Sequence, residues 1–202
     1  DGRRKCFLEF DLESVLPVLN NAVIKEAKLT LYLLQQRSVA INIGAYEARR
    51  RWLDTEATWT LATQNQQWTV AGADGLDSDR AATAEYTVQN VRLAGPYSFN
   101  LRSLLQRWLA VPGSNYGLVL IGSGPYTSAK YPLASAEYGD TGKRPLLEIL
   151  YMDPTPTPTA TSTSTVTPTS TPIVTPSPTF TSTPTLTATR VAWYIYLPLI
   201  LK

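Results

Sequence analysis

A block of threonine, serine and proline, residues 153–190, most constrains how this chain can fold. From Pro154 to Thr189, 29 of 36 residues are Thr, Ser or Pro, and none is charged or a glycine. Proline lacks the amide donor of a helix or sheet ladder, so this composition favours an extended polyproline II spacer. The chain therefore divides into a domain at 1–152, the spacer at 153–190 and an apolar end at 191–202.

The spacer carries two sets of candidate functional residues. Val174, Phe180 and Leu186 are spaced by six, and polyproline II repeats every three residues, so their side chains share one side of the spacer. We expect that side to dock on a domain surface. Closely spaced hydroxyls beside proline are typical of O-glycosylated stalks. The expected glycosylation sites are Thr155, Thr157, Thr159, Thr161, Thr163, Thr165, Thr167 and Thr169.

Residues 1–152 have the pattern of an all-β protein, an antiparallel sandwich. Seven short runs rich in β-branched and aromatic residues alternate with turn signals such as AGADG and VPGSN. In the second run, Ala27, Leu29, Leu31 and Leu33 recur at strand period. The expected strands lie within 4–11, 23–34, 39–48, 82–91, 97–101, 116–123 and 144–151.

One short helix is expected near residues 102–110. Its apolar residues are spaced by three and four, and Pro112-Gly113 ends the pattern; they are Leu101, Leu104, Leu105, Trp108 and Leu109. This helix would cap one end of the sandwich. Trp52, Trp59 and Trp108 are expected in the core or at its corners.

The composition argues against an enzyme and against a nucleic-acid partner. The chain has no histidine and one cysteine, Cys6, which removes the commonest general base, the commonest zinc ligand and any internal disulfide. Cys6 alternates with Leu8 and Phe10, so we expect a buried thiol. The net charge of +2 and two short basic runs do not form a nucleic-acid footprint. No cofactor is expected.

Segments spread over residues 3–151 resemble the DNRLRE-type domain of secreted prokaryotic proteins. They include RRKCFLEFDLESVLP, AVIKEAKLTLYL, ARRRWLDTEATW, YSFNLRSLLQRWLA, NYGLVLIG and KRPLLEILY, in that order. The resemblance implies a jelly-roll β-sandwich, and some members of the family are carbohydrate-binding modules. Members usually open with one or two further strands, whereas Asp1 and Gly2 alone precede the match here. We therefore expect an open sheet edge, and a processed N-terminus.

Two further sets of candidates carry binding chemistry. Oxygen ligands for a Ca²⁺ ion are offered by the ADGLDSD loop, but it lacks EF-hand spacing, and a solvated loop is the favoured alternative; the candidate ligands are Asp74, Asp77 and Asp79. Sugar rings stack on exposed aromatics, and the candidates for that role are Trp68, Tyr126 and Tyr131.

The final twelve residues, VAWYIYLPLILK, have the character of a β-strand. A membrane span needs about 20 apolar residues, so no span is expected, although an interfacial anchor, a sorting tail and self-insertion stay open. The favoured alternative is donation to the open edge of a neighbouring copy, beside RKCFLEFD. Pro198 has no amide donor, so pairing should weaken there, leaving Leu199–Leu201 only to pack. The joining residues would be Val191, Trp193, Ile195, Leu197 and Leu199.

Two classes of function follow. The first is a structural subunit of an extracellular or cell-surface filament, a homopolymer held by C-terminal strands and carrying covalent O-glycans. The second is a carbohydrate-binding module, with polysaccharide as its partner, tethered by the glycosylated stalk.

Overall fold

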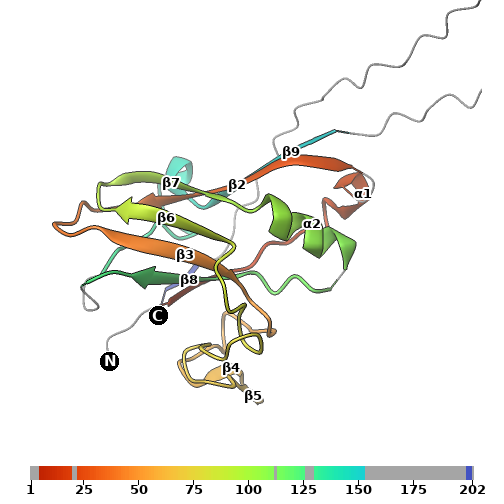
Figure 1. The fold of residues 1–202 in the computed structure, drawn as a ribbon, viewed down its shortest axis with the longest axis horizontal. Coiled ribbons are helices and arrows are strands. Elements are labelled where there is room, and N and C mark those ends of the chain that lie inside the picture. The colour runs from red at the N-terminus through yellow and green to blue at the C-terminus, as the bar shows by residue number, and fades with distance from the viewer. Residues whose placement is uncertain (1–4, 20–21, 112, 126–129, 153–198, 202) are drawn as a thin grey trace, which may run out of the picture.

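The computed structural model describes residues 5–19, 22–111, 113–125, 130–152 and 199–201. These residues form an all-β, sandwich-like fold of antiparallel sheets, and 11% of them are helical. Two sheets pack around one apolar core (Figure 1).

The larger sheet has five strands in the order β10–β1–β8–β3–β6, and every pairing in it is antiparallel. Its strands are β1 (Lys5–Leu8), β3 (Ile41–Glu47), β6 (Tyr86–Val91), β8 (Leu118–Ser123) and β10 (Leu199–Leu201). The order is not the chain order, because the first strand lies between the last strand and β8.

The second sheet has three strands in the order β7–β2–β9. Its strands are β2 (Val23–Leu33), β7 (Gly95–Asn100) and β9 (Leu146–Met152). A two-stranded hairpin, β4 (Leu61–Thr63) and β5 (Gln66–Gln67), stands apart from both sheets. Each of the seven predicted runs overlaps a strand of the two main sheets, although β7 begins two residues before its run and β9 ends one residue after its run.

Strand alternation places the core. Ala27, Leu29, Leu31 and Leu33 of β2 are all buried in the main apolar cluster, as the period of two predicts. Burying each leucine contributes about 2 kcal/mol before the ordering cost. Facing them across the core are residues of the larger sheet such as Leu8 and Leu120.

Three short helical segments complete the fold: α1 (Leu16–Leu19), α2 (Arg102–Ala110) and the 3₁₀ turn η1 (Thr141–Lys143). The sequence predicts α2, which buries Leu104, Leu105 and Trp108. The Asn100 side chain accepts a hydrogen bond from the backbone N–H of Arg102 at its start. The single turn of α1 has no comparable apolar spacing and was not expected.

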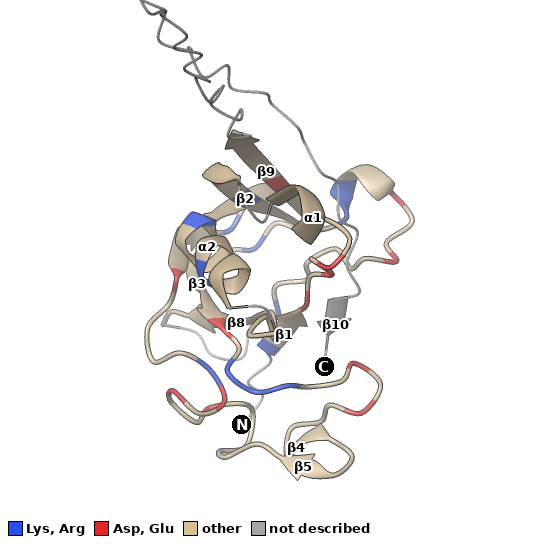
Figure 2. Cartoon of the chain, turned by 90° about the vertical axis from the view of Figure 1, so that its right-hand side faces the viewer, with Lys and Arg blue, Asp and Glu red and all other residues tan. Residues whose placement is uncertain are grey.

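Residues 48–85, between β3 and β6, form what we call the connecting layer. It contains the β4–β5 hairpin and projects from one side of the sandwich in Figures 1 and 2. Its own apolar cluster is separate from the main core and consists of Trp52, Ala57, Ala62, Trp68 and Ala73.

Candidate functional site: the β1 edge and the connecting layer

The outer edge of β1 receives the C-terminal strand. In register, Cys6 lies opposite Leu201, Phe7 opposite Ile200 and Leu8 opposite Leu199. The other edge of β1 pairs with β8 from Lys5 to Leu8. Residues 199–201 therefore complete the main-chain ladder of β1 on the side away from β8.

The pairing of Leu199–Leu201 differs from the expectation that these residues only pack. Proline removes a single amide donor, so Pro198 does not prevent the residues after it from forming a ladder. Three register pairs follow it here. Residues 191–198, which hold the other predicted joining residues, lie outside the described part of the chain.

β1 contacts a different part of the protein on each face. Leu8 is fully buried in the main core, and Cys6 packs against the same core. On the opposite face, Phe7 packs against the cluster of the connecting layer, and the Lys5 side chain reaches Gly72 of that layer. A four-residue strand is thus covered on both sides.

Aromatic rings form the contact between β1 and the layer. The Phe7 ring lies 5.1 Å from Trp52 and stacks on Trp68 at 5.4 Å, with 18° between the planes. Trp52 donates its indole N–H to the carbonyl of Tyr116 at 2.9 Å. Both tryptophans are buried with their polar atoms satisfied, which fixes the rings that meet Phe7.

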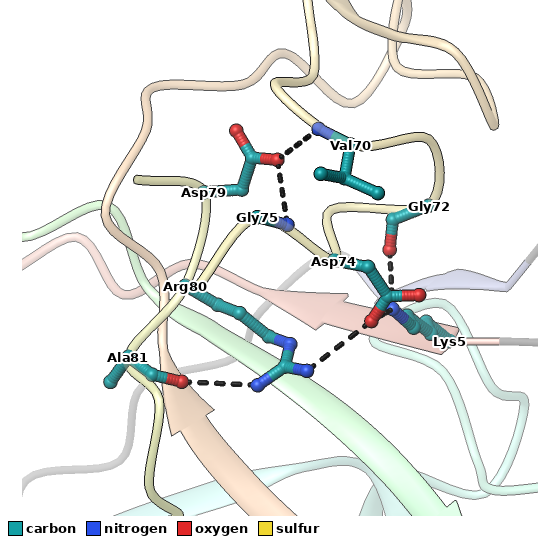
Figure 3. A network of polar contacts seen from close by, with 8 residues as sticks. All are labelled: Lys5, Val70, Gly72, Asp74, Gly75, Asp79, Arg80 and Ala81. Carbon is teal, nitrogen blue, oxygen red and sulfur yellow. Dashed lines mark hydrogen bonds and ion pairs between the residues drawn. The ribbon is translucent and has the colours of Figure 1, made fainter. Parts of the chain in front are cut away.

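A buried ionic network holds the layer to β1 (Figure 3). The Lys5 ammonium group donates to the Gly72 carbonyl at 2.6 Å and pairs with the Asp74 carboxylate. Arg80 reaches the same carboxylate at 3.3 Å. Burial by itself raises the pKa of Asp74, but the hydrogen bonds and charges of Lys5 and Arg80 outweigh it and lower that pKa below its ordinary value.

Asp79 organises the layer from within. Its side chain is fully buried, and its two oxygens accept hydrogen bonds from three backbone N–H groups and from Arg50. The backbone donors are Thr69, Val70 and Gly75. Burial opposes ionisation, but these donors prevail and lower the pKa of Asp79.

The three aspartates predicted as Ca²⁺ candidates face cations and N–H donors rather than a common point. Asp74 and Asp79 are engaged as above, and Asp77 accepts the backbone N–H of Ala82 at 3.0 Å. Among the described residues, no group of three or more His, Cys, Asp or Glu is placed to hold a metal. The arrangement favours a structural role for these carboxylates.

Trp68, expected as an exposed platform for sugar, is instead 5% exposed. Its indole N–H donates to the Thr58 carbonyl, and its ring faces Phe7. Tyr131 is partly buried against the main core and donates its hydroxyl to the Val39 carbonyl at 2.7 Å. Tyr126 lies outside the described residues. The expectation is corrected for Trp68, because the connecting layer folds over that ring.

Trp59, expected in the core or at a corner, is 45% exposed. Gly72 lies against its ring so closely that a Cβ there would come within 2.5 Å of it. The Lys5 ammonium group is 5.9 Å from the ring centroid. Trp59 is therefore an exposed aromatic ring held in place by the layer. The residues next to it in the sequence do not distinguish it from the buried Trp52.

Cys6, expected as a buried thiol, is partly exposed and packs against the main core. Burial raises its pKa to about 12, so it is un-ionised at neutral pH and a poor nucleophile while it stays covered. It faces the main core next to the edge that pairs with β10. Its chemistry can therefore report whether that edge is open.

The predicted spacer residues lie outside the described part of the chain, both the docking set (Val174, Phe180, Leu186) and the threonines from Thr155 to Thr169. A scan against protein-family models finds no match for this chain, and a search of curated proteins finds none either. The resemblance to the DNRLRE-type domain stays a prediction. Within the described ranges, no helix is long and apolar enough to cross a bilayer.

Proposed function

We propose that this protein is the subunit of an extracellular filament, in which the C-terminal strand of one copy pairs with β1 of the next. Each subunit would be a jelly-roll sandwich carrying a glycosylated spacer. The observation that carries the proposal is the ladder between residues 199–201 and the outer edge of β1.

The strand order shows which edge of β1 would be open. β10 is the terminal strand of the larger sheet and β1 is next to it. Without residues 199–201, no described strand lies beside Cys6–Leu8 on the side away from β8, and this side of the sheet would be an open edge. A strand added there gains main-chain hydrogen bonds, and this is the mode of donor-strand assembly.

In the structure the paired strand belongs to the same chain as β1, and the length of the connection allows the same pairing with a neighbouring copy. Residues 153–198, 46 in number, separate Met152 at the end of β9 from Leu199 at the start of β10. At ~3.1 Å per residue in polyproline II they span up to about 140 Å. A domain of this size is about 40 Å across. The connection is several times longer than a strand returning to its own domain needs.

A cysteine cross-link tests the proposal directly. Residues opposite one another in an antiparallel pair have Cα atoms about 4.5–5.5 Å apart, within the range of a disulfide. Leu201→Cys places a thiol opposite the native Cys6. Oxidation of the assembled protein should give a ladder of covalent multimers on a non-reducing gel. A cross-linked monomer alone would show that the strand is its own and would refute the filament joint.

The matched control is Ile200→Cys, one residue away. Ile200 lies opposite Phe7, whose side chain is on the other face of β1 from Cys6. A thiol there should not bond to Cys6. Deletion of residues 191–202 completes the test, since truncated chains that still form fibres of the same repeat would exclude the strand as the joint. Intact mass above that of the polypeptide would support the glycans.

Trp59 favours a second candidate, the tethered carbohydrate-binding module. It is a half-exposed aromatic ring fixed from below by Gly72 and flanked by a cation, and such a surface can stack on a sugar ring. Trp59→Ala should abolish retardation in gels that contain a bound polysaccharide, whereas Leu93→Ala, at another exposed apolar residue, should not. Equal mobility of wild type with and without each polysaccharide tested would remove this candidate.

A further inference from the structure

β1 is buried on both faces, and this constrains the strand that pairs with it. Lys5 and Leu8 are buried, and Cys6 and Phe7 are partly buried although they point to opposite sides. The main core covers one face and the connecting layer covers the other. Strands covered on both faces are apolar throughout rather than alternating with polar residues.

The C-terminal segment has that composition. From Val191 to Leu201 no residue is charged, and both alternate sets are apolar or aromatic. One set contains Trp193, Ile195, Leu197, Leu199 and Leu201; the other contains Ala192, Tyr194, Tyr196, Pro198 and Ile200. A strand at the edge of a one-sided sandwich needs a single apolar face. The second apolar set is therefore unexplained by the main core alone.

Register assigns residues 199–201 to the two faces of the sheet. Opposite residues of an antiparallel pair lie on the same side of the sheet. Leu199 and Leu201 are opposite Leu8 and Cys6, the residues on the core face, and Ile200 is opposite Phe7 on the face of the layer.

We infer that the connecting layer is a second wall of the acceptor site. The aromatic cluster of Phe7, Trp52 and Trp68 recognises the residue of the incoming strand that lies opposite Phe7, which is Ile200. This deepens the proposed function, because it names which residues select the strand, and it depends on that function only for which copy supplies the strand. A strand with a polar residue at position 200 would bind less tightly, since the desolvation of that residue beside the rings has no hydrogen bond to offset it.

The two tryptophans suit this role because hydrogen bonds fix the orientation of their rings. The indole N–H groups of Trp52 and Trp68 are bound to the carbonyls of Tyr116 and Thr58, both at 2.9 Å. The ion pair between Lys5 and Asp74 holds the layer on the same face of β1. The wall is therefore in place before a strand arrives, and less ordering is needed on binding.

The test uses the native Cys6 as a reporter in the full-length protein. Its covered thiol reacts with N-ethylmaleimide when the edge of β1 opens, so the alkylation rate measures release of the strand. Ile200→Ser should raise that rate by about tenfold or more, since it puts a polar side chain in place of an aliphatic one opposite Phe7. Leu199→Ser should raise it as well. Leu93→Ser, at an exposed residue far along the chain, should leave it within about twofold.

A double-mutant cycle with Phe7→Leu tests whether the aromatic cluster contacts Ile200. If Ile200 packs on Phe7, the effect of Ile200→Ser should shrink by about threefold or more in the Phe7→Leu background. Independent effects of the two substitutions would overturn the inference. So would an unchanged alkylation rate for Ile200→Ser, whether or not Leu199→Ser raises it. The Leu201→Cys cross-link reports separately which copy supplies the strand, so failure of the filament and failure of the wall are distinguishable.

Discussion

Replacing Asp79 by asparagine should destabilise the connecting layer while keeping its shape. The carboxylate accepts four hydrogen bonds, two at each oxygen. An asparagine keeps one oxygen and turns an NH₂ group toward the other two donors. Two buried donors lose their acceptor and Arg50 loses its counter-charge, at about 1–3 kcal/mol for each unsatisfied group. We expect a total loss of about 3 kcal/mol.

For a domain of this size that loss corresponds to a fall of about 6–12 °C in Tm. Tryptophan fluorescence reports mainly the layer, which contains three of the five tryptophans (Trp52, Trp59 and Trp68), and far-UV circular dichroism reports the whole sandwich. Asp77→Asn is the matched control, because Asp77 makes one exposed hydrogen bond and its φ of 58° is one that asparagine tolerates. It should shift Tm by no more than about 2 °C.

Acid provides an independent check on the same carboxylate. The pKa of Asp79 is lowered in the folded protein, so its contribution to stability is complete above the unfolded pKa of about 4 and is lost as pH falls through the lower folded value. The gap in Tm between wild type and Asp79→Asn should therefore narrow below about pH 4. A Tm for Asp79→Asn equal to that of Asp77→Asn at neutral pH would refute the reasoning.

Two further predictions concern the surroundings of β1. Gly117→Ala should be strongly destabilising, since a Cβ at this φ of +77° would meet the Leu8 carbonyl. Gly113→Ala, with φ +85° and open space around it, should cost only about 1 kcal/mol. Equal urea midpoints for the two variants would contradict this expectation. Trp52→Phe should lower the urea midpoint by the equivalent of about 2–4 kcal/mol, because it leaves a cavity and an unpaired Tyr116 carbonyl; an unchanged midpoint would show that the layer tolerates the loss.

The parts of the fold that depend on local periodicity were predictable from the sequence. The alternation through Ala27 and Leu33 and the helical spacing through Leu104 and Trp108 report burial against one large core, and the structure buries all four. Each signal is contained within a dozen residues. Such patterns survive in any fold that gives the segment one apolar face.

The connecting layer was not predictable in the same way. Trp68 is buried and Trp59 is exposed, although the two are nine residues apart in similar polar sequence. What separates them is Phe7, more than fifty residues away, and the close approach of Gly72. The three aspartates likewise suggested a cation site, because nothing local shows that Lys5 reaches Asp74. Long-range contacts decide these cases.

The two ends of the segment 153–198 belong to different sheets, since β9 is in the three-stranded sheet and β10 in the five-stranded one. If this segment closes a loop within one copy, doubling its length costs only about 0.6 kcal/mol, and if it joins two copies, no such loop is closed. Deleting one residue within β10 would instead move every side chain of that strand to the opposite face. Insertions and deletions among the Thr-Pro pairs are therefore nearly neutral, while the register of the last few residues is fixed. Over evolutionary time the length of this segment is free to drift, and the order of residues in the strand that follows it is not.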